Sequence, residues 1–74
     1  MAYEYPTSAG ILRLLRVQRR WSLQFRGRRS GEWRSPDAAA IAAARHETGL
    51  SAWDRQRHDV SDDLLDWRPL GESL

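Results

Sequence analysis

The chain has 74 residues, enough for one small domain. It contains no cysteine, which excludes disulfides and thiolate metal sites, and no apolar run long enough to span a membrane. All 12 basic residues are arginine, and they are unevenly placed, because residues 1–34 carry a net charge of +6 and residues 35–74 carry −4. An asymmetry of this kind indicates an interaction surface. The alternative is self-neutralisation, in which the acidic half folds over the basic half.

The beginning of the chain shows no targeting pattern. Residues 1–10 are polar, include Glu4 and lack a cationic start followed by an apolar run. Pro6 and Gly10 interrupt regular structure. We therefore expect a loose lead-in over residues 1–10 and a cytoplasmic protein.

Residues 11–34 are predicted to form the strands of an antiparallel sheet. Residues 11–17 (ILRLLRV) are rich in branched aliphatic side chains and favour a strand, although a helix competes for so short an apolar run. Either Leu12 and Leu14, or Ile11, Leu15 and Val17, face the core.

The clearest strand is residues 21–25 (WSLQF), where apolar and polar residues alternate. Trp21, Leu23 and Phe25 then share one face, which we expect to point toward the core.

A hairpin containing Gly27 is predicted to connect this strand to a return strand over residues 31–34. A two-residue turn at positions 27–28 would pair Trp33 with Ser22 and turn the indole toward solvent. A loop of three to five residues would pair Trp33 with Leu23 instead, and we prefer it for that reason.

Residues 35–49 are predicted to form an alanine-rich helix. Ser35 suits the N-cap, Pro36 the first helical position and Asp37 the positive end of the helix dipole. Gly49 is the expected left-handed stop. Three residues at helical spacing form the expected core face: Ala40, Ile41 and Ala44.

Residues 50–74 form an acidic tail with two predicted short helical turns, at residues 51–54 and 61–67, the second ended by Arg68 and Pro69. Four apolar side chains are expected to close the core: Trp53, Leu64, Leu65 and Trp67. The predicted fold class is thus α+β, with a two- to three-stranded antiparallel sheet packed on one alanine-rich helix and a short-helix tail.

Polar side chains on the sheet form the first candidate binding site. The predicted basic face comprises Arg20, Gln24, Arg26, Arg28, Arg29 and Arg34. Arginine and glutamine can read base edges and phosphates, so the sheet could bind DNA or RNA. The alternative is an ordinary solvated sheet face.

The tail carries the second candidate site, an acidic patch of four residues: Asp59, Asp62, Asp63 and Asp66. It lacks the glycine and glutamate of a calcium loop. It is either a solvated helix start or a contact surface for an arginine-rich partner.

The sequence contains no recognisable pattern of catalytic or metal-binding residues. His46 and His58 are twelve positions apart without a cysteine, which does not make a zinc site. No nucleophile elbow or oxyanion loop is recognisable. We therefore predict that the chain is no enzyme, with no catalytic residue, metal, cofactor or small-molecule substrate.

Residues 21–45 combine Trp-Ser-Leu-Gln-Phe, a hairpin with glycine, Gly-Glu-Trp and Ser-Pro-Asp-Ala at a helix start. This pattern resembles small phage and prophage proteins, and its outline is similar to the arm-type DNA-binding domains of phage integrases. The resemblance implies a three-stranded sheet with a polar face for the major groove, packed on one helix. By size alone the chain also resembles phage-encoded inhibitors such as anti-CRISPR proteins.

Two functions are compatible with these features. In the first, the chain is a binding protein of phage or mobile-element type that inhibits or adapts a host protein complex, for example a defence system such as CRISPR–Cas. In the second, the basic sheet face binds DNA or RNA. We rank the first ahead because the acidic half would oppose a phosphate backbone.

Overall fold

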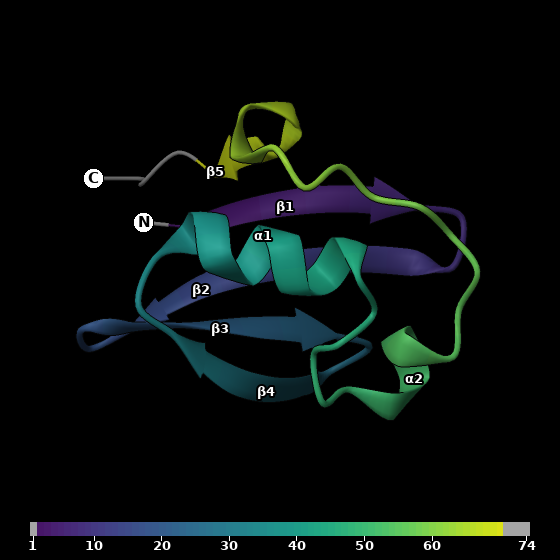
Figure 1. Cartoon of the computed structure of the whole chain (residues 1–74), viewed down its shortest axis with the longest axis horizontal. Helices are drawn as coiled ribbons and strands as arrows, with labels where there is room; N and C mark the ends of the chain where they lie inside the picture. Colours follow the sequence, from purple (N-terminus) through teal and green to yellow (C-terminus); the bar gives the residue numbers. More distant parts are fainter. Residues whose placement is uncertain (1, 71–74) are drawn as a thin grey trace.

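The computed structural model describes residues 2–70, which form a five-stranded antiparallel sheet with one main helix packed on one face (Figure 1). The α+β class is confirmed, but two or three strands were too few. The sheet order is β4-β3-β2-β1-β5. The strands are β1 (Ala2–Thr7), β2 (Gly10–Val17), β3 (Arg20–Phe25), β4 (Arg28–Trp33) and β5 (Arg68–Leu70).

Strand β1 replaces the expected loose lead-in. Tyr3 lies opposite Leu14 of β2 and Tyr5 lies opposite Leu12, so both rings turn toward the core. Pro6 is tolerated because the register with β5 covers only the first three residues of β1. The alternation of Tyr3, Glu4 and Tyr5 favours a strand. The prediction of a loose segment gave more weight to Pro6 than to this pattern and was wrong.

The core lies between the sheet and the helix. Leu12 and Leu14 are completely buried, which settles the register of β2. The predicted inward face of β3 is confirmed, since Trp21, Leu23 and Phe25 are 7%, 0% and 1% exposed.

The turn between β3 and β4 is shorter than expected. It consists of Arg26 and Gly27 alone, with φ of 52° and 78°, as in the type I′ turns that suit the twist of a hairpin. Phe25 therefore pairs with Arg28, and the expected loop of three to five residues is wrong.

A β-bulge nevertheless keeps Trp33 on the inner face. Ser22 of β3 faces two residues of β4, Gly31 and Glu32, so Trp33 pairs with Trp21 rather than with Leu23. The indole of Trp33 packs against the core. The bulge thus turns the Trp33 indole toward the core, as the longer loop was expected to do.

Helix α1 (Pro36–Ala44) begins where the sequence predicted, because the Ser35 hydroxyl accepts a hydrogen bond from the Ala38 amide at 3.1 Å. Its buried face differs from the predicted one. Ala39, Ala40 and Ala43 are fully buried, whereas Ile41 is 39% exposed. The small methyl groups let the helix lie close to the tryptophans of the core.

The helix also ends earlier than expected. His46 takes the left-handed conformation (φ 56°), and its amide donates to the carbonyl of Ala43 at 3.1 Å. The Glu47 amide donates to Ala42 at 3.0 Å, completing a Schellman motif. Gly49 has a positive φ as well, but lies beyond this stop.

The tail forms helix α2 (Ser51–Asp54) and one 3₁₀ turn, η1 (Leu64–Asp66). Trp53 and Trp67 are buried as expected, but Leu65 is 91% exposed and does not join the core. Arg68 and Pro69 belong to β5, not to a simple stop. Residues 71–74 of the predicted tail lie outside the described range. None of the helices between residues 2 and 70 has the length and hydropathy of a membrane-spanning segment.

Candidate binding interface

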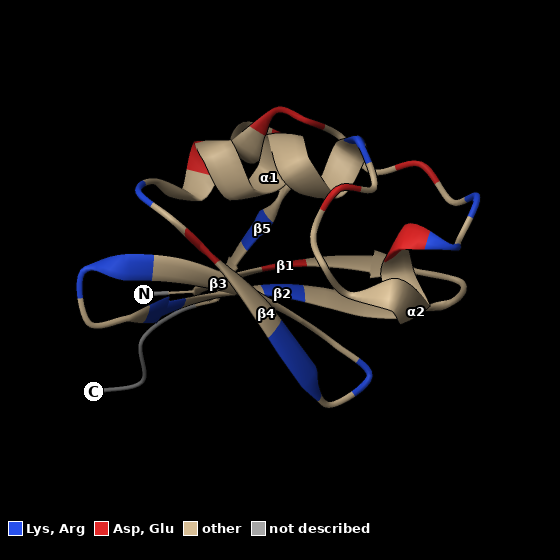
Figure 2. Ribbon diagram, turned by 60° about the horizontal axis from the view of Figure 1, so that its bottom comes forward, with Lys and Arg blue, Asp and Glu red and all other residues tan. Residues whose placement is uncertain are grey.

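Helix α1 covers one face of the sheet, and no helix of residues 2–70 lies on the opposite face, here called the outer face (Figures 1 and 2). Residues directly opposite each other in an antiparallel pair point to the same side. The register therefore places one polar row across all five strands: Arg29, Gln24, Arg13, Glu4 and Arg68.

Glu4 lies between Arg13 and Arg68 in this polar row. Its carboxylate lies 3.3 Å from the Arg68 guanidinium and 4.0 Å from that of Arg13. These are the only ion pairs among the described side chains. The glutamate thus neutralises one end of the row, while Arg29 forms no ion pair with a described residue.

An aliphatic stripe runs along the centre of the outer face, on β2. It is defined by Ile11, Leu15 and Val17, which alternate with the buried leucines of the same strand. Ile11 is 42% exposed, and the other two are partly exposed. Ala2 and Leu70 extend the apolar surface, because Ala2 lies opposite both Leu15 and Leu70. Arg13 occupies the outward position between Ile11 and Leu15, so the outer face carries apolar side chains on its central strand with arginines between and beside them.

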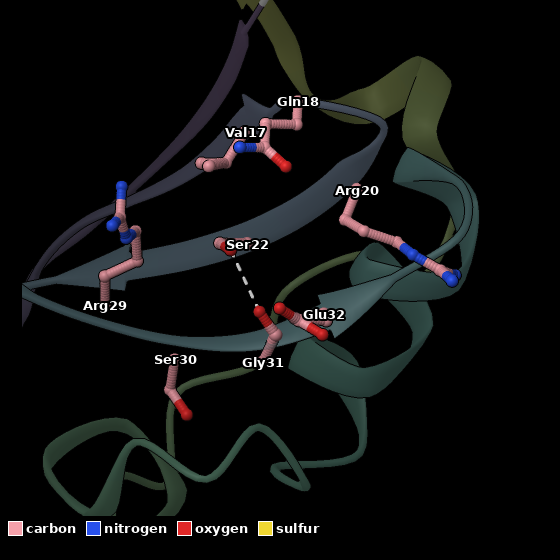
Figure 3. A pocket seen from close by; sticks show the side chains of 8 residues that line it. All are labelled: Val17, Gln18, Arg20, Ser22, Arg29, Ser30, Gly31 and Glu32. Atoms are coloured by element: carbon pink, nitrogen blue, oxygen red, sulfur yellow. Dashed lines mark hydrogen bonds between the residues drawn. The ribbon is translucent and has the colours of Figure 1, made fainter.

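The bulge opens a hollow of about 450 Å³ on the outer face, beside the aliphatic stripe. Ser22 lies at its centre and donates a hydrogen bond of 2.9 Å to the carbonyl of Gly31 (Figure 3). Arg29 lines one side and Glu32 another, with Val17 above them in this view. The hollow thus adds both charge signs and an apolar wall to the outer face.

The predicted basic face is divided by the structure. Arg20, Gln24 and Arg29 lie on the outer face, as expected. Arg28 pairs with the inward-facing Phe25 and so points to the helix side, and Arg34 follows β4 in the connection to α1.

Arg26 is engaged within the chain. Its guanidinium donates to the carbonyl of Ala9 at 3.0 and 3.2 Å and lies 5.1 Å from the centroid of the Phe25 ring. This side chain connects the β3–β4 turn to the β1–β2 turn, so it stabilises the fold rather than offering a free cation.

Sequence reasoning missed Arg13, Arg68 and the aliphatic stripe. The register of β2 was open, so the outward positions of that strand were unassigned. Arg68 joins the outer face only because β5 pairs with β1, and no local pattern over residues 68–70 indicates a strand.

The acidic patch lies away from the outer face, with α1, α2 and the segments after them (Figure 2). Asp63 caps η1 by accepting from the Leu65 amide at 3.0 Å, and Asp66 accepts from the Ser61 hydroxyl at 2.5 Å. Asp59 and Asp62 are exposed. Among the described residues no aspartate of this patch pairs with an arginine, so self-neutralisation by ion pairing is not observed.

The histidines have local partners. The His46 ring stacks on Trp53 at 4.8 Å between centroids, and its Nδ1 lies 3.1 Å from the Trp53 carbonyl. His58 lies 3.3 Å from the Ser8 hydroxyl. Residues 2–70 contain no group of three or more histidine or carboxylate side chains that could hold a metal ion.

Comparisons with protein-family models, curated proteins and solved structures found no match to this chain. The outer face must therefore be interpreted from its own chemistry.

Proposed function

We propose that this chain is a non-enzymatic protein-binding module whose outer face docks on an acidic surface of another protein. The observation that carries this proposal is a sheet face that no helix of residues 2–70 covers, with an aliphatic stripe on its central strand, interrupted by Arg13, and further arginines beside it. Protein interfaces combine an apolar centre with a polar rim, and arginine is enriched in them.

The charge distribution supports an acidic partner. Arg20 and Arg29 border the outer face without an ion pair to any described residue. The acidic segments among residues 35–66 lie on the helix side (Figure 2), so they do not oppose an anionic partner on the outer face. Complementary charge would orient the partner and accelerate its association.

Duplex nucleic acid is the second candidate for the same face. Arg13, Gln24 and Arg29 lie side by side on three neighbouring strands, and these residue types read guanine and adenine edges. The position of the acids removes our main argument against this candidate. We still rank it second, because a phosphate backbone offers nothing apolar to cover Ile11, Leu15 and Val17.

Single-stranded nucleic acid fits less well. Proteins that bind it stack bases on aromatic side chains. Within the described sheet, Tyr3, Tyr5, Trp21, Phe25 and Trp33 all belong to the inner face, where they contact the core. Inhibition of a host complex or of a defence system such as CRISPR–Cas stays a prediction.

Affinity capture with matched charge variants tests the proposal. Arg20→Glu/Arg29→Glu should abolish retention of the protein partner from the native host, and Leu15→Ser should weaken it. Arg55→Glu/Arg57→Glu makes the same change of charge in the segment that follows α2, and this variant should retain the partner. Equal loss with both double variants would show that net charge alone drives the binding.

The nucleic-acid candidate has its own assay. Fluorescence anisotropy with mixed-sequence duplex DNA at low salt should detect no binding if the function is protein docking. Tight binding that weakens steeply with salt and is lost in Arg20→Glu/Arg29→Glu would favour the second candidate.

A further inference from the structure

Leu65 is the most exposed large apolar side chain among the described residues, and it has no role in the core of the fold. It is 91% exposed, at the middle of η1. Its neighbour Leu64 packs against the core instead. The turn thus places Leu64 against the core and leaves Leu65 exposed to solvent.

The turn that presents Leu65 is firmly held. The Asp63 amide donates to the Ser61 hydroxyl at 3.0 Å, and the indole NH of Trp67 donates to the Ser61 carbonyl at 2.9 Å. Since Trp67 is only 2% exposed, this bond anchors the turn to the core. An anchored turn loses little conformational entropy on binding.

The surroundings of Leu65 complement the outer face. Asp62, Asp63 and Asp66 are within three positions of the exposed leucine in the sequence, and arginines lie between and beside the residues of the aliphatic stripe. The two surfaces cannot meet within one molecule, because η1 contacts α1 on the opposite side of the sheet.

We propose that the outer face of one copy receives Leu65 and the acidic turn of a second copy. The leucine covers part of the aliphatic stripe, while the carboxylates of the turn approach Arg20 and Arg29. This inference rests on the proposed function, because it assigns a second copy as one acidic partner of the same face.

Such a contact is heterologous, since two different surfaces meet, and it propagates head to tail rather than closing as a symmetric dimer. One turn buries little area, so the association should be weak. It should also weaken with salt, because exposed charges contribute to it. Self-association would then occupy the binding face at high concentration and release it on dilution.

Complementation between two variants tests this arrangement by sedimentation velocity. Leu65→Arg removes the turn surface but keeps the outer face, and Arg20→Glu/Arg29→Glu does the reverse. Each variant alone should self-associate at least about tenfold more weakly than the natural chain. Their equimolar mixture should form a one-to-one dimer that grows no further. Ile41→Arg makes the same change on α1 and should leave self-association unaltered.

Two outcomes would overturn the inference. One is a natural chain that stays monomeric at low salt and high concentration. The other is Leu65→Arg associating alone as strongly as the natural chain. If in either case the outer-face variants still lose the host partner, only the head-to-tail contact fails. If Arg20→Glu/Arg29→Glu both self-associates normally and keeps its host partner, the proposed function fails as well.

Discussion

Gly31 shows how a single residue controls the shape of the outer face. Its φ of +85° is in the left-handed region, and it forms the bulge together with Glu32. A Cβ atom at this position would overlap with carbon atoms of the Trp33 ring. Only glycine allows the bulge and the packing of Trp33 at the same time.

Gly31→Ala is therefore expected to lower the free energy of unfolding by about 2–4 kcal/mol, from backbone strain and overpacking together. Gly27→Ala is the matched control. Gly27 also has a positive φ, of 78°, but no atom lies within 4 Å of an added Cβ. It should cost only about 1 kcal/mol in urea unfolding followed by tryptophan fluorescence. Equal costs would contradict the tight packing of the bulge.

Asp54 holds the loop between α1 and α2. Its carboxylate accepts hydrogen bonds from the Thr48 hydroxyl at 2.8 Å, the Thr48 amide at 3.1 Å and the Gly49 amide at 3.0 Å. Thr48 is only 4% exposed, so water cannot readily replace these bonds.

Asp54→Ala should destabilise the protein by about 2–3 kcal/mol, because it leaves buried donors without acceptors. Asp54→Asn keeps one acceptor oxygen and should cost roughly half as much. Thermal unfolding by circular dichroism measures both. A cost below about 0.5 kcal/mol for the alanine variant would show that these hydrogen bonds contribute little.

At the scale of the elements, short sequence patterns correctly predicted the features that depend on neighbouring residues alone. The start of α1 followed from Ser35 and Pro36, and the inward face of β3 from strict alternation. Strand β5 could not be foreseen, because it depends on pairing with β1, more than sixty positions earlier. For the same reason Arg68 could not be placed on the candidate interface.

Helix α1 offers a test of the corrected core face. Ala40→Leu should lower the free energy of unfolding by about 1–3 kcal/mol, because the fully buried methyl group leaves no room for a larger side chain. Ile41→Gln should cost less than about 1 kcal/mol, since Ile41 is 39% exposed. Chemical denaturation that ranks the two variants in the opposite order would contradict the orientation of the helix.

At the scale of the whole molecule, the uneven charge of the sequence becomes a division between two sides. The outer face carries Arg20 and Arg29, while the acidic patch lies on the helix side of the sheet (Figure 2). The sequence indicated the asymmetry, but only the register of the strands shows that an aliphatic stripe accompanies the arginines. That combination distinguishes a protein interface from a purely basic surface.

Site-specific photo-crosslinking in the native host tests the outer face most directly. A benzoylphenylalanine in place of Gln24 should give a covalent adduct with a protein other than a second copy of the chain. The same group in place of Ile41, on α1, should give none. An adduct only from position 41, or an adduct from position 24 that consists of nucleic acid, would contradict protein docking on this face.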